Sequence, residues 1–219
     1  MTLQPDQLWD TMTQFGLGAL TASGFPGESA GMLTHYSNWR PISQATLAYG
    51  YGVSVTPLQL AQAYAAIGDG GKRHPISLVA LEQAGDGERV VGEDTASSVR
   101  RMLEEVVRPG GTGTKAAIDG YRIAGKTGTA WKFATGGYSQ DKYISIFAGM
   151  APASAPRLAT VVVIDEPSGE LYYGSDVAAP VFADVMSESL RLLAVPPDNM
   201  PARDPGNVIQ AMATRPEKQ

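Results

Sequence analysis

The chain has 219 residues, of which 43% are hydrophobic, so it is long enough to form one globular domain with a full core. A net charge of -5 without any basic run excludes the electrostatic footprint that nucleic acid binding requires, so no nucleic acid partner is expected. The absence of cysteine excludes disulfides and thiol chemistry, and the sequence shows neither a bilayer-spanning apolar run nor a signal-peptide pattern after Met1.

The first expected element is an amphipathic helix over residues 5–16, which glycines end. Its apolar face is formed by Leu8, Trp9, Met12 and Phe15. Residues 23–40 follow without any periodicity, and we expect a long irregular segment there. Irregular segments of this length in a compact domain usually belong to a functional site.

A second helix is expected over residues 57–68. Thr56 stands at its cap position, Pro57 at its first helical position, and Gln59 three residues after the cap, which is the pattern of a capping box. Glycines end this helix as well. Residues 76–81 and 89–91 then flank a Gly-Asp-Gly turn, and this arrangement predicts a small hairpin.

A third helix is expected over residues 93–108, with acidic residues in its first turn and glycines beyond its end. Its apolar face is formed by Val99, Met102, Leu103 and Val106. Two pairs of opposite charge four residues apart, Arg100 with Glu104 and Arg101 with Glu105, support this helix on its exposed side.

Residues 121–129, 143–149 and 158–164 are strand-like. The second and third are joined by only eight residues, too few for a crossover helix, so antiparallel pairing is predicted. A final helix over residues 181–193, beginning after Pro180, should pack on this sheet. The pattern predicts a mixed α/β chain of the α+β kind.

The chain divides into a folded part, residues 1–194, and a tail, residues 195–219, that is rich in proline and polar residues and is expected to be mobile. His35 and His74, the two histidines, lie in polar loop-like contexts and are expected on the surface. Neither a metal nor a cofactor is expected.

The most informative segment is Gly125-Lys126-Thr127-Gly128-Thr129, on the first of the three strands. A lysine and two hydroxyls on one strand can receive a carboxylate, since Lys126 supplies charge, Thr127 and Thr129 supply donors, and Gly128 lets a ligand approach the backbone. A strand edge can also bind an extended peptide by β-augmentation. The three letters Lys-Thr-Gly alone are a weak signal.

Five segments in the same order resemble the class B penicillin-binding proteins. They are Gly24-Phe25-Pro26-Gly27-Glu28, Tyr49-Gly50-Tyr51-Gly52, Thr56-Pro57-Leu58-Gln59-Leu60-Ala61, Gly110-Gly111-Thr112-Gly113-Thr114 and Ala124-Gly125-Lys126-Thr127-Gly128-Thr129-Ala130. The similarity covers residues 8–194 and looks closest to the division-septum D,D-transpeptidase, which cross-links peptidoglycan and is the target of β-lactams. The resemblance implies part of a serine β-lactamase/D,D-transpeptidase-like fold, an antiparallel sheet packed with helices.

The resemblance also implies roles. Lys126 would lie in the catalytic cleft, while Thr127 and Thr129, beside Gly128, would bind the carboxylate of a D-alanyl-D-alanine stem or a β-lactam. The backbone N–H of Thr129 would form half of the oxyanion hole.

Three tyrosines complete the expected substrate site. Tyr172 and Tyr173 resemble the aromatic wall of the family's cleft, and Tyr138 resembles the aromatic residue in the loop after the Lys-Thr-Gly strand. Each is individually about as typical of ordinary packing.

Two further motifs of the family, the Ser-x-x-Lys nucleophile and Ser-x-Asn, do not occur in matching positions, so no nucleophile is assigned and the chain alone is expected not to acylate. Ser139-Gln140-Asp141-Lys142 matches Ser-x-x-Lys in letters only. It follows Lys126 instead of preceding it and leads into a strand, so it lacks the helical turn that would bring the two side chains together. The apolar faces that upstream elements of the family would cover are expected to favour self-association.

Stem peptides, β-lactams and, for the parent protein, membrane proteins of the divisome are the partners that the resemblance implies, at the periplasmic face of the inner membrane. Two alternatives stay open. One is a β-lactamase-related hydrolase, although no motif here places a glutamate for deacylation. The other is a module that binds peptidoglycan peptides without chemistry.

Overall fold

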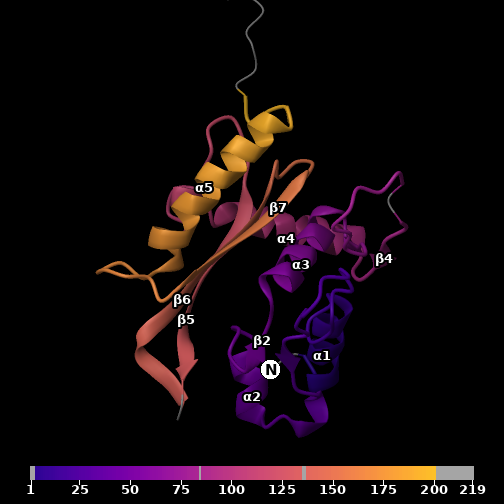
Figure 1. Cartoon of the computed structure of the whole chain (residues 1–219), viewed down its shortest axis with the longest axis vertical. Coiled ribbons are helices and arrows are strands. Elements are labelled where there is room, and N and C mark those ends of the chain that lie inside the picture. Colours follow the sequence, from indigo (N-terminus) through magenta and orange to yellow (C-terminus); the bar gives the residue numbers. More distant parts are fainter. Residues whose placement is uncertain (1–2, 84, 135–136, 201–219) are drawn as a thin grey trace, which may run out of the picture.

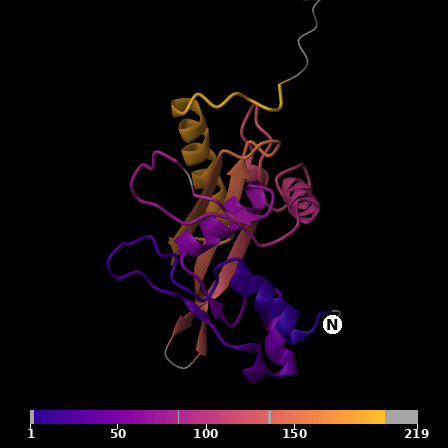
Figure 2. The ribbon, with the colours of Figure 1, turned by 90° about the vertical axis from the view of Figure 1, so that its right-hand side faces the viewer.

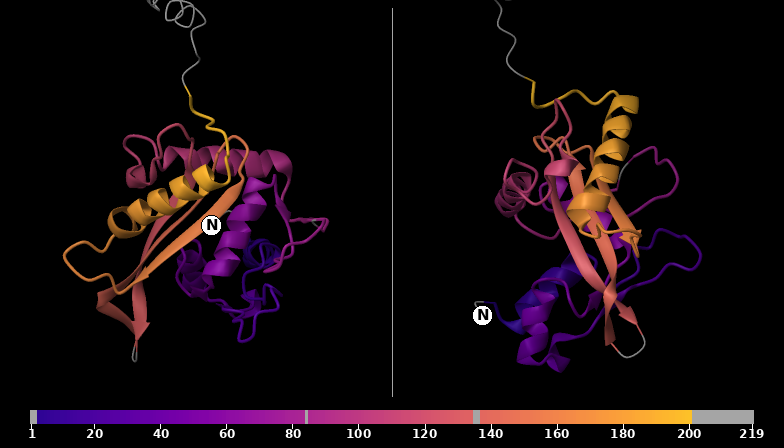
Figure 3. Two further views of the ribbon diagram at one scale, coloured as in Figure 1. Left: turned by 45° about the horizontal axis from the view of Figure 1, so that its top comes forward. Right: turned by 90° about the vertical axis from the view of Figure 1, so that its left-hand side faces the viewer.

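The computed structural model describes residues 3–83, 85–134 and 137–200. At its centre lies a three-stranded antiparallel sheet in the order β5 (Ala124–Ala134), β6 (Gly137–Ala151) and β7 (Leu158–Asp165). Helix α5 (Gly174–Leu192) covers one face of the sheet, and α3 (Pro57–Gly68) lies on the other side (Figures 1 and 3). The antiparallel pairing and the mixed α+β class predicted from the sequence are confirmed.

The core consists of two clusters, one on each face of the sheet. On the α5 face, Phe147 of β6 contacts Phe182 with ring centroids 4.6 Å apart. The rest of this cluster includes Met186 and Leu190, which are fully buried. On the other face, Met150 packs with residues of α3 and α4. The sheet is therefore held from both sides, which fixes the position of its edge strand β5.

Helix α5 begins at Gly174, seven residues before the predicted start at residue 181. The prediction started the helix directly after Pro180, but this proline lies inside the helix. The tertiary contact at Gly174 explains the earlier start. A Cβ at this position would lie well under 3.0 Å from the carbonyl oxygens of Gly128 and Ile146, so only glycine lets the helix begin directly on the sheet.

The N-terminal part contains α1 (Pro5–Gln14), β1 (Met32–Leu33), α2 (Pro41–Leu47) and β2 (Val53–Ser54), together with a 3-10 turn at Tyr36–Asn38. Figure 2 shows α1 and α2 at the end of the molecule opposite the end of α5. Helix α1 confirms the first predicted helix with an end two residues earlier. Helix α2 was not predicted, and apart from β1 and the 3-10 turn the segment 23–40 is irregular as expected.

Helix α3 has the predicted bounds and the predicted capping box. The Thr56 hydroxyl accepts from the Gln59 backbone N–H at 3.1 Å, and the Gln59 amide oxygen accepts from the Thr56 N–H at 2.8 Å. The buried Gln59 amide nitrogen also donates to the carbonyls of Gly16, Ala19 and Ala30. The cap therefore also holds the irregular segment against α3.

The predicted hairpin is wrong in its first strand. The pairing partner of β4 (Glu88–Arg89) is β3 (Lys72–Arg73), and residues 76–81 form no strand. Gly71 decides this register, because a Cβ there would lie well under 3.0 Å from the Val91 carbonyl oxygen and its φ of +89° suits glycine.

Helix α4 (Glu93–Glu105) ends three residues before the predicted end, and a 3-10 turn at Thr114–Ala116 follows it. The end of α4 carries a nearly buried Glu104, which pairs with Arg122 at 2.8 Å. None of the helices formed by the described residues combines the length and apolar character needed to cross a bilayer.

The beginning of the predicted tail is anchored. Val195 is buried, and its carbonyl accepts from the Tyr121 hydroxyl at 2.6 Å. The Asp198 carboxylate accepts from the backbone N–H groups of Arg122 and Ser154. The rest of the predicted tail, residues 201–219, lies outside the described residues.

Candidate active-site strand

The Lys-Thr-Gly segment lies on β5, which is an edge strand of the three-stranded sheet. The backbone N–H of Trp131 donates to the Tyr51 hydroxyl at 3.4 Å and so points away from β6. In an antiparallel ladder every second residue has the same backbone orientation. The N–H groups of Thr129 and Thr127 therefore also face the free edge.

Lys126 has an exposed side chain. Its ammonium donates to the carbonyl oxygen of Thr127 at 2.9 Å and forms no ion pair within the described residues. Lys132 and Lys142, by contrast, pair with carboxylates of Asp165 or Glu166. The ammonium of Lys126 therefore lies at the free edge of β5 with its charge uncompensated.

The two threonines point to the other face of the sheet, because side chains alternate along a strand. The Thr127 hydroxyl lies 3.1 Å from the Thr112 hydroxyl. The Thr129 hydroxyl accepts from the backbone N–H of Gly174 at 3.0 Å, so its own proton remains available to donate. Both side chains are half-buried where β5 meets the start of α5.

Gly128 lies between the threonines, and a Cβ there would make an ordinary 3.5 Å contact with the Ile146 Cβ. The sterically demanding glycines here are Gly125 and Gly174, because a Cβ at either would lie under 3.0 Å from a backbone carbonyl oxygen. Gly174 was not assigned to the site from the sequence. Thr112 was likewise not assigned to the site, although its Gly-Gly-Thr-Gly-Thr segment was noted.

Tyr172 and Tyr173 lie directly before α5. The Tyr172 ring stacks on Tyr143 with centroids 4.0 Å apart and planes 15° apart. The Tyr172 hydroxyl donates to the Tyr173 hydroxyl at 3.2 Å, and this bond together with desolvation raises the pKa of Tyr172 to about 12. Tyr173 is exposed. Both tyrosines are connected to Thr129 through the neighbouring Gly174 N–H.

Tyr138 belongs to a different aromatic group. Its ring meets Tyr51 edge-on at 5.1 Å and Phe133 at 5.5 Å. Tyr51 also contacts Tyr49 at 5.9 Å. Tyr143, on which Tyr172 stacks, pairs with Trp131, and Tyr138 pairs with Phe133, so both aromatic groups lie beyond the C-terminal end of the Lys-Thr-Gly segment. The contribution of Tyr51 was not anticipated.

The rejected Ser-x-x-Lys match lies in β6, not on a helix. The Ser139 hydroxyl donates to the Asp141 carboxylate at 2.5 Å, and the Lys142 ammonium donates to Glu166 at 3.1 Å. Three residues along a strand are about 10 Å apart and on opposite faces. Lys142 is therefore not placed to accept a proton from Ser139.

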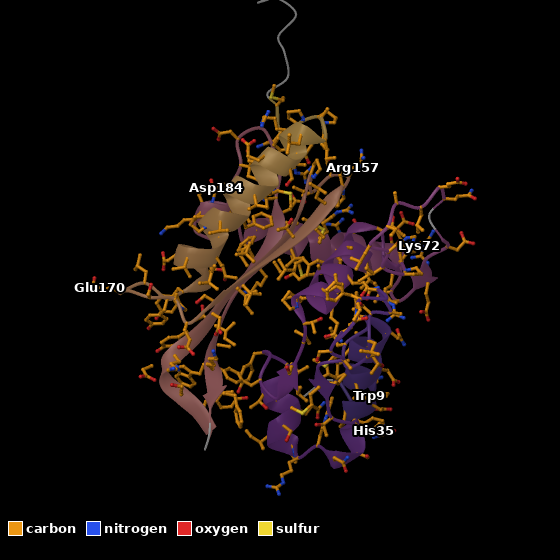
Figure 4. The ribbon with its side chains drawn as sticks, in the orientation of Figure 1. Trp9, His35, Lys72, Arg157, Glu170 and Asp184 are labelled. Atoms are coloured by element: carbon orange, nitrogen blue, oxygen red, sulfur yellow. The ribbon has the colours of Figure 1, made fainter. Side chains whose placement is uncertain are left out.

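Neither histidine lies near the strand. His35 contacts Trp9 edge-on at 4.8 Å, and Figure 4 shows this pair in the N-terminal part. His74 lies 2.7 Å from the Asp69 carboxylate. His35 is exposed, and the His74 side chain is also partly open to solvent.

Comparison with known proteins gives consistent matches. Residues 2–187 match the family described as penicillin binding protein transpeptidase domain. The chain is 46% identical over 204 residues to peptidoglycan D,D-transpeptidase FtsI of Escherichia coli K12, which covers 93% of this chain and 35% of that protein. It is 44% identical over 192 residues to probable peptidoglycan D,D-transpeptidase PenA of Neisseria meningitidis serogroup B, covering 88% and 33%.

A solved structure is also similar. The transpeptidase domain of penicillin-binding protein 3 from Burkholderia pseudomallei aligns with a TM-score of 0.85 at 46% identity, covering 92% of this chain and 61% of that one. The chain spans about a third of the length of the curated relatives it matches.

Proposed function

We propose, from the premise that this chain belongs to the penicillin-binding protein transpeptidase domain family, that β5 is the substrate-binding strand of a serine peptidoglycan D,D-transpeptidase. The parent enzyme would cross-link stem peptides in septal cell-wall synthesis and bind β-lactams. It would act at the periplasmic face of the inner membrane with divisome proteins as partners. The identity to FtsI and PenA proteins supports this reaction class.

The observation that carries the proposal is the free edge of β5. One uncompensated ammonium, that of Lys126, lies beside backbone N–H groups that point out of the sheet. The hydroxyls of Thr127 and Thr129 lie half-buried on the same short segment. Charge and directed donors together suit a terminal carboxylate on an extended peptide, which would lie along the edge as an added strand.

In the proposed reaction, Lys126 and the two hydroxyls hold the D-alanyl carboxylate, and Gly128 leaves room for the peptide backbone. The N–H of Thr129 then stabilises the negative charge that develops on the scissile carbonyl oxygen. One such donor typically lowers the barrier by about 2.7 to 4 kcal/mol. Tyr173 and Tyr138 are exposed and would contact the side chains of the ligand.

Acyl transfer also requires a nucleophile and a base. Within the described residues no serine hydroxyl bonds to Lys126, and Ser139 bonds to Asp141. We therefore propose that this chain binds the ligand but does not form an acyl-enzyme by itself.

Equilibrium binding of a D-alanyl-D-alanine peptide, followed by calorimetry, tests the proposal. The chain should bind, and Lys126→Ala should weaken binding at least ten-fold. Arg40→Ala is the matched control, because Arg40 is also exposed and forms no ion pair within the described residues but lies directly before α2. Equal loss in both variants, or no binding by the unaltered chain, would contradict the assignment of β5.

Fluorescent penicillin tests the second part of the proposal. After incubation and denaturing electrophoresis, we expect no covalent label on the chain. A stable adduct would mean that Ser139 or another serine of this chain is a nucleophile after all. Turnover of a chromogenic cephalosporin by the intact parent would favour the hydrolase alternative.

A further inference from the structure

A second charged feature lies at the end of α3, and no residue of β5 lines it. Here the end of α3, the β3–β4 hairpin, the first turns of α4 and the turn before β7 enclose a cavity of about 470 Å³. Four cationic residues line this cavity: Lys72, Arg89, Arg100 and Arg157. We call this cavity with its four cations the basic cleft.

The cations of the basic cleft are not neutralised by neighbours. Within the described residues, none of the four forms an ion pair. Two carboxylates also line the cleft. Asp69 is engaged by His74 at 2.7 Å, whereas Glu93 has no ion-pair partner. In a chain of net charge -5, such a concentration of unpaired positive charge is costly unless an anion offsets it.

Two of the guanidinium groups are held in place by backbone carbonyls. One terminal nitrogen of Arg89 donates to the carbonyl oxygens of Gly70 and Val91, at 2.9 and 3.1 Å. One terminal nitrogen of Arg100 donates to the carbonyl oxygen of Gly68 at 3.4 Å. In each group the other two nitrogens are left for a ligand. A planar guanidinium fixed in this way is suited to bidentate hydrogen bonding with a phosphate group.

Lys72 and Arg157 complete the cleft from the hairpin and from the turn before β7. Figure 4 shows both on the side of the molecule where α4 lies. Both side chains are exposed and free to move toward a bound anion. A bound anion would thus contact two guanidinium groups held in fixed orientations and two mobile cationic side chains, which come from several separate segments of the chain.

We propose that the basic cleft is a binding site for a compact phosphate-bearing anion of the pyrophosphate class, separate from the transpeptidase site. The site is concave and of a size typical of small-molecule sites, which are about 300–1,000 Å³. A compact anion in this concave site could contact cations from the β3–β4 hairpin, from α4 and from the turn before β7 at the same time. The proposal does not depend on the function assigned to β5.

Calorimetric titration of the chain with pyrophosphate, with sulfate titrated in parallel at the same ionic strength, is the test. We expect one site, and the affinity for pyrophosphate should fall when the titration is repeated at higher salt concentrations. Lys72→Ala combined with Arg157→Ala should weaken binding at least ten-fold. The matched control is Arg40→Ala combined with Arg191→Ala, which removes the same charge from exposed positions outside the cleft and should leave affinity unchanged.

Glu93→Gln provides a test in the opposite direction. It removes the unpaired carboxylate from the cleft and should tighten pyrophosphate binding several-fold, a gain that no loss of folding could mimic. The proposal is overturned if the unaltered chain does not bind, if both double variants lose affinity equally, or if sulfate binds as tightly as pyrophosphate. Binding to phosphatidylglycerol vesicles or to polyglutamate without pyrophosphate binding would also overturn it, in favour of a membrane or an acidic protein segment.

Discussion

Replacing Gln59 by Met should lower the free energy of unfolding far more than replacing a glutamine on the surface would. The Gln59 side chain is fully buried. Its oxygen accepts from the Thr56 N–H, and its nitrogen contacts three carbonyl oxygens, at 3.3 Å for Gly16, 2.6 Å for Ala19 and 2.9 Å for Ala30. An amide has two N–H donors, so these three carbonyls share two protons. The side chain therefore makes about three hydrogen bonds.

At about 1 kcal/mol net for each bond, Gln59→Met should lower the free energy of unfolding by about 3 kcal/mol, since methionine fills a similar volume without replacing any bond. The matched control is Gln62→Met on the same helix. Gln62 makes one side-chain bond, to the His74 carbonyl at 2.7 Å, so it should cost only about 1 kcal/mol. Urea unfolding monitored by circular dichroism measures both. Equal midpoints for the two variants would refute the idea that Gln59 holds the irregular segment.

Gln59→Glu sharpens this test. The carboxylate keeps an acceptor for the Thr56 N–H but turns an oxygen toward three carbonyls. The variant should therefore be less stable than Gln59→Met at neutral pH. Because this environment raises the pKa of the buried carboxyl above its unfolded value, protonation should restore stability as the pH falls. If acidification instead destabilised Gln59→Glu further relative to Gln59→Met, the geometry would be contradicted.

Three further predictions concern the site and its surroundings. Gly174→Ala should cost about 1–3 kcal/mol in urea unfolding and weaken peptide binding, because its Cβ would meet two backbone carbonyl oxygens, whereas Gly85→Ala, with open space around it, should be nearly neutral. Hydrogen bonds from Lys132 and Lys142 lower the pKa of the Glu166 carboxyl below 4.5, so the chain should lose stability as the pH falls through that lowered pKa. Lys132→Ala should make the stability of the chain less sensitive to acid. An unchanged dependence of stability on pH in this variant would contradict the prediction. The Tyr172 hydroxyl should ionise near pH 12. The tyrosinate absorbance of the Tyr172→Phe variant should therefore fall below that of the unaltered chain near pH 12, whereas the two should agree near pH 10.

Local signals predicted the elements that local contacts decide. The bounds of α3 follow from Thr56 and Gln59, which bond to each other across one helical turn. The antiparallel order of the sheet follows from the short connection before β7. The elements that were misplaced depend on distant contacts. The start of α5 is set where Gly174 meets β5 and β6, and the β3–β4 register is set where Gly71 meets Val91.

The same division holds for the candidate site. The residue types of β5 indicated carboxylate binding before any geometry was available, because charge and hydroxyl donors stand side by side in the sequence. The sequence did not indicate that Thr112 faces Thr127 or that Tyr51 reaches the backbone of Trp131, since these partners are separated by 15 and 80 residues. No periodicity or motif spacing reports contacts of that range.

The hydrogen bond from the Gly174 N–H to the Thr129 hydroxyl joins a residue type that the sequence indicated to a long-range contact that it did not. By accepting from the first backbone N–H of α5, the hydroxyl is held in place and keeps its proton, together with its second lone pair, for a ligand. Lys126 has no comparable restraint, because its ammonium bonds only to the carbonyl of the next residue. Thr129 is thus preorganised for a directional contact, whereas Lys126 can follow the ligand. This difference suits the proposed pair, in which the Thr129 hydroxyl gives the bound carboxylate its direction and Lys126 neutralises its charge.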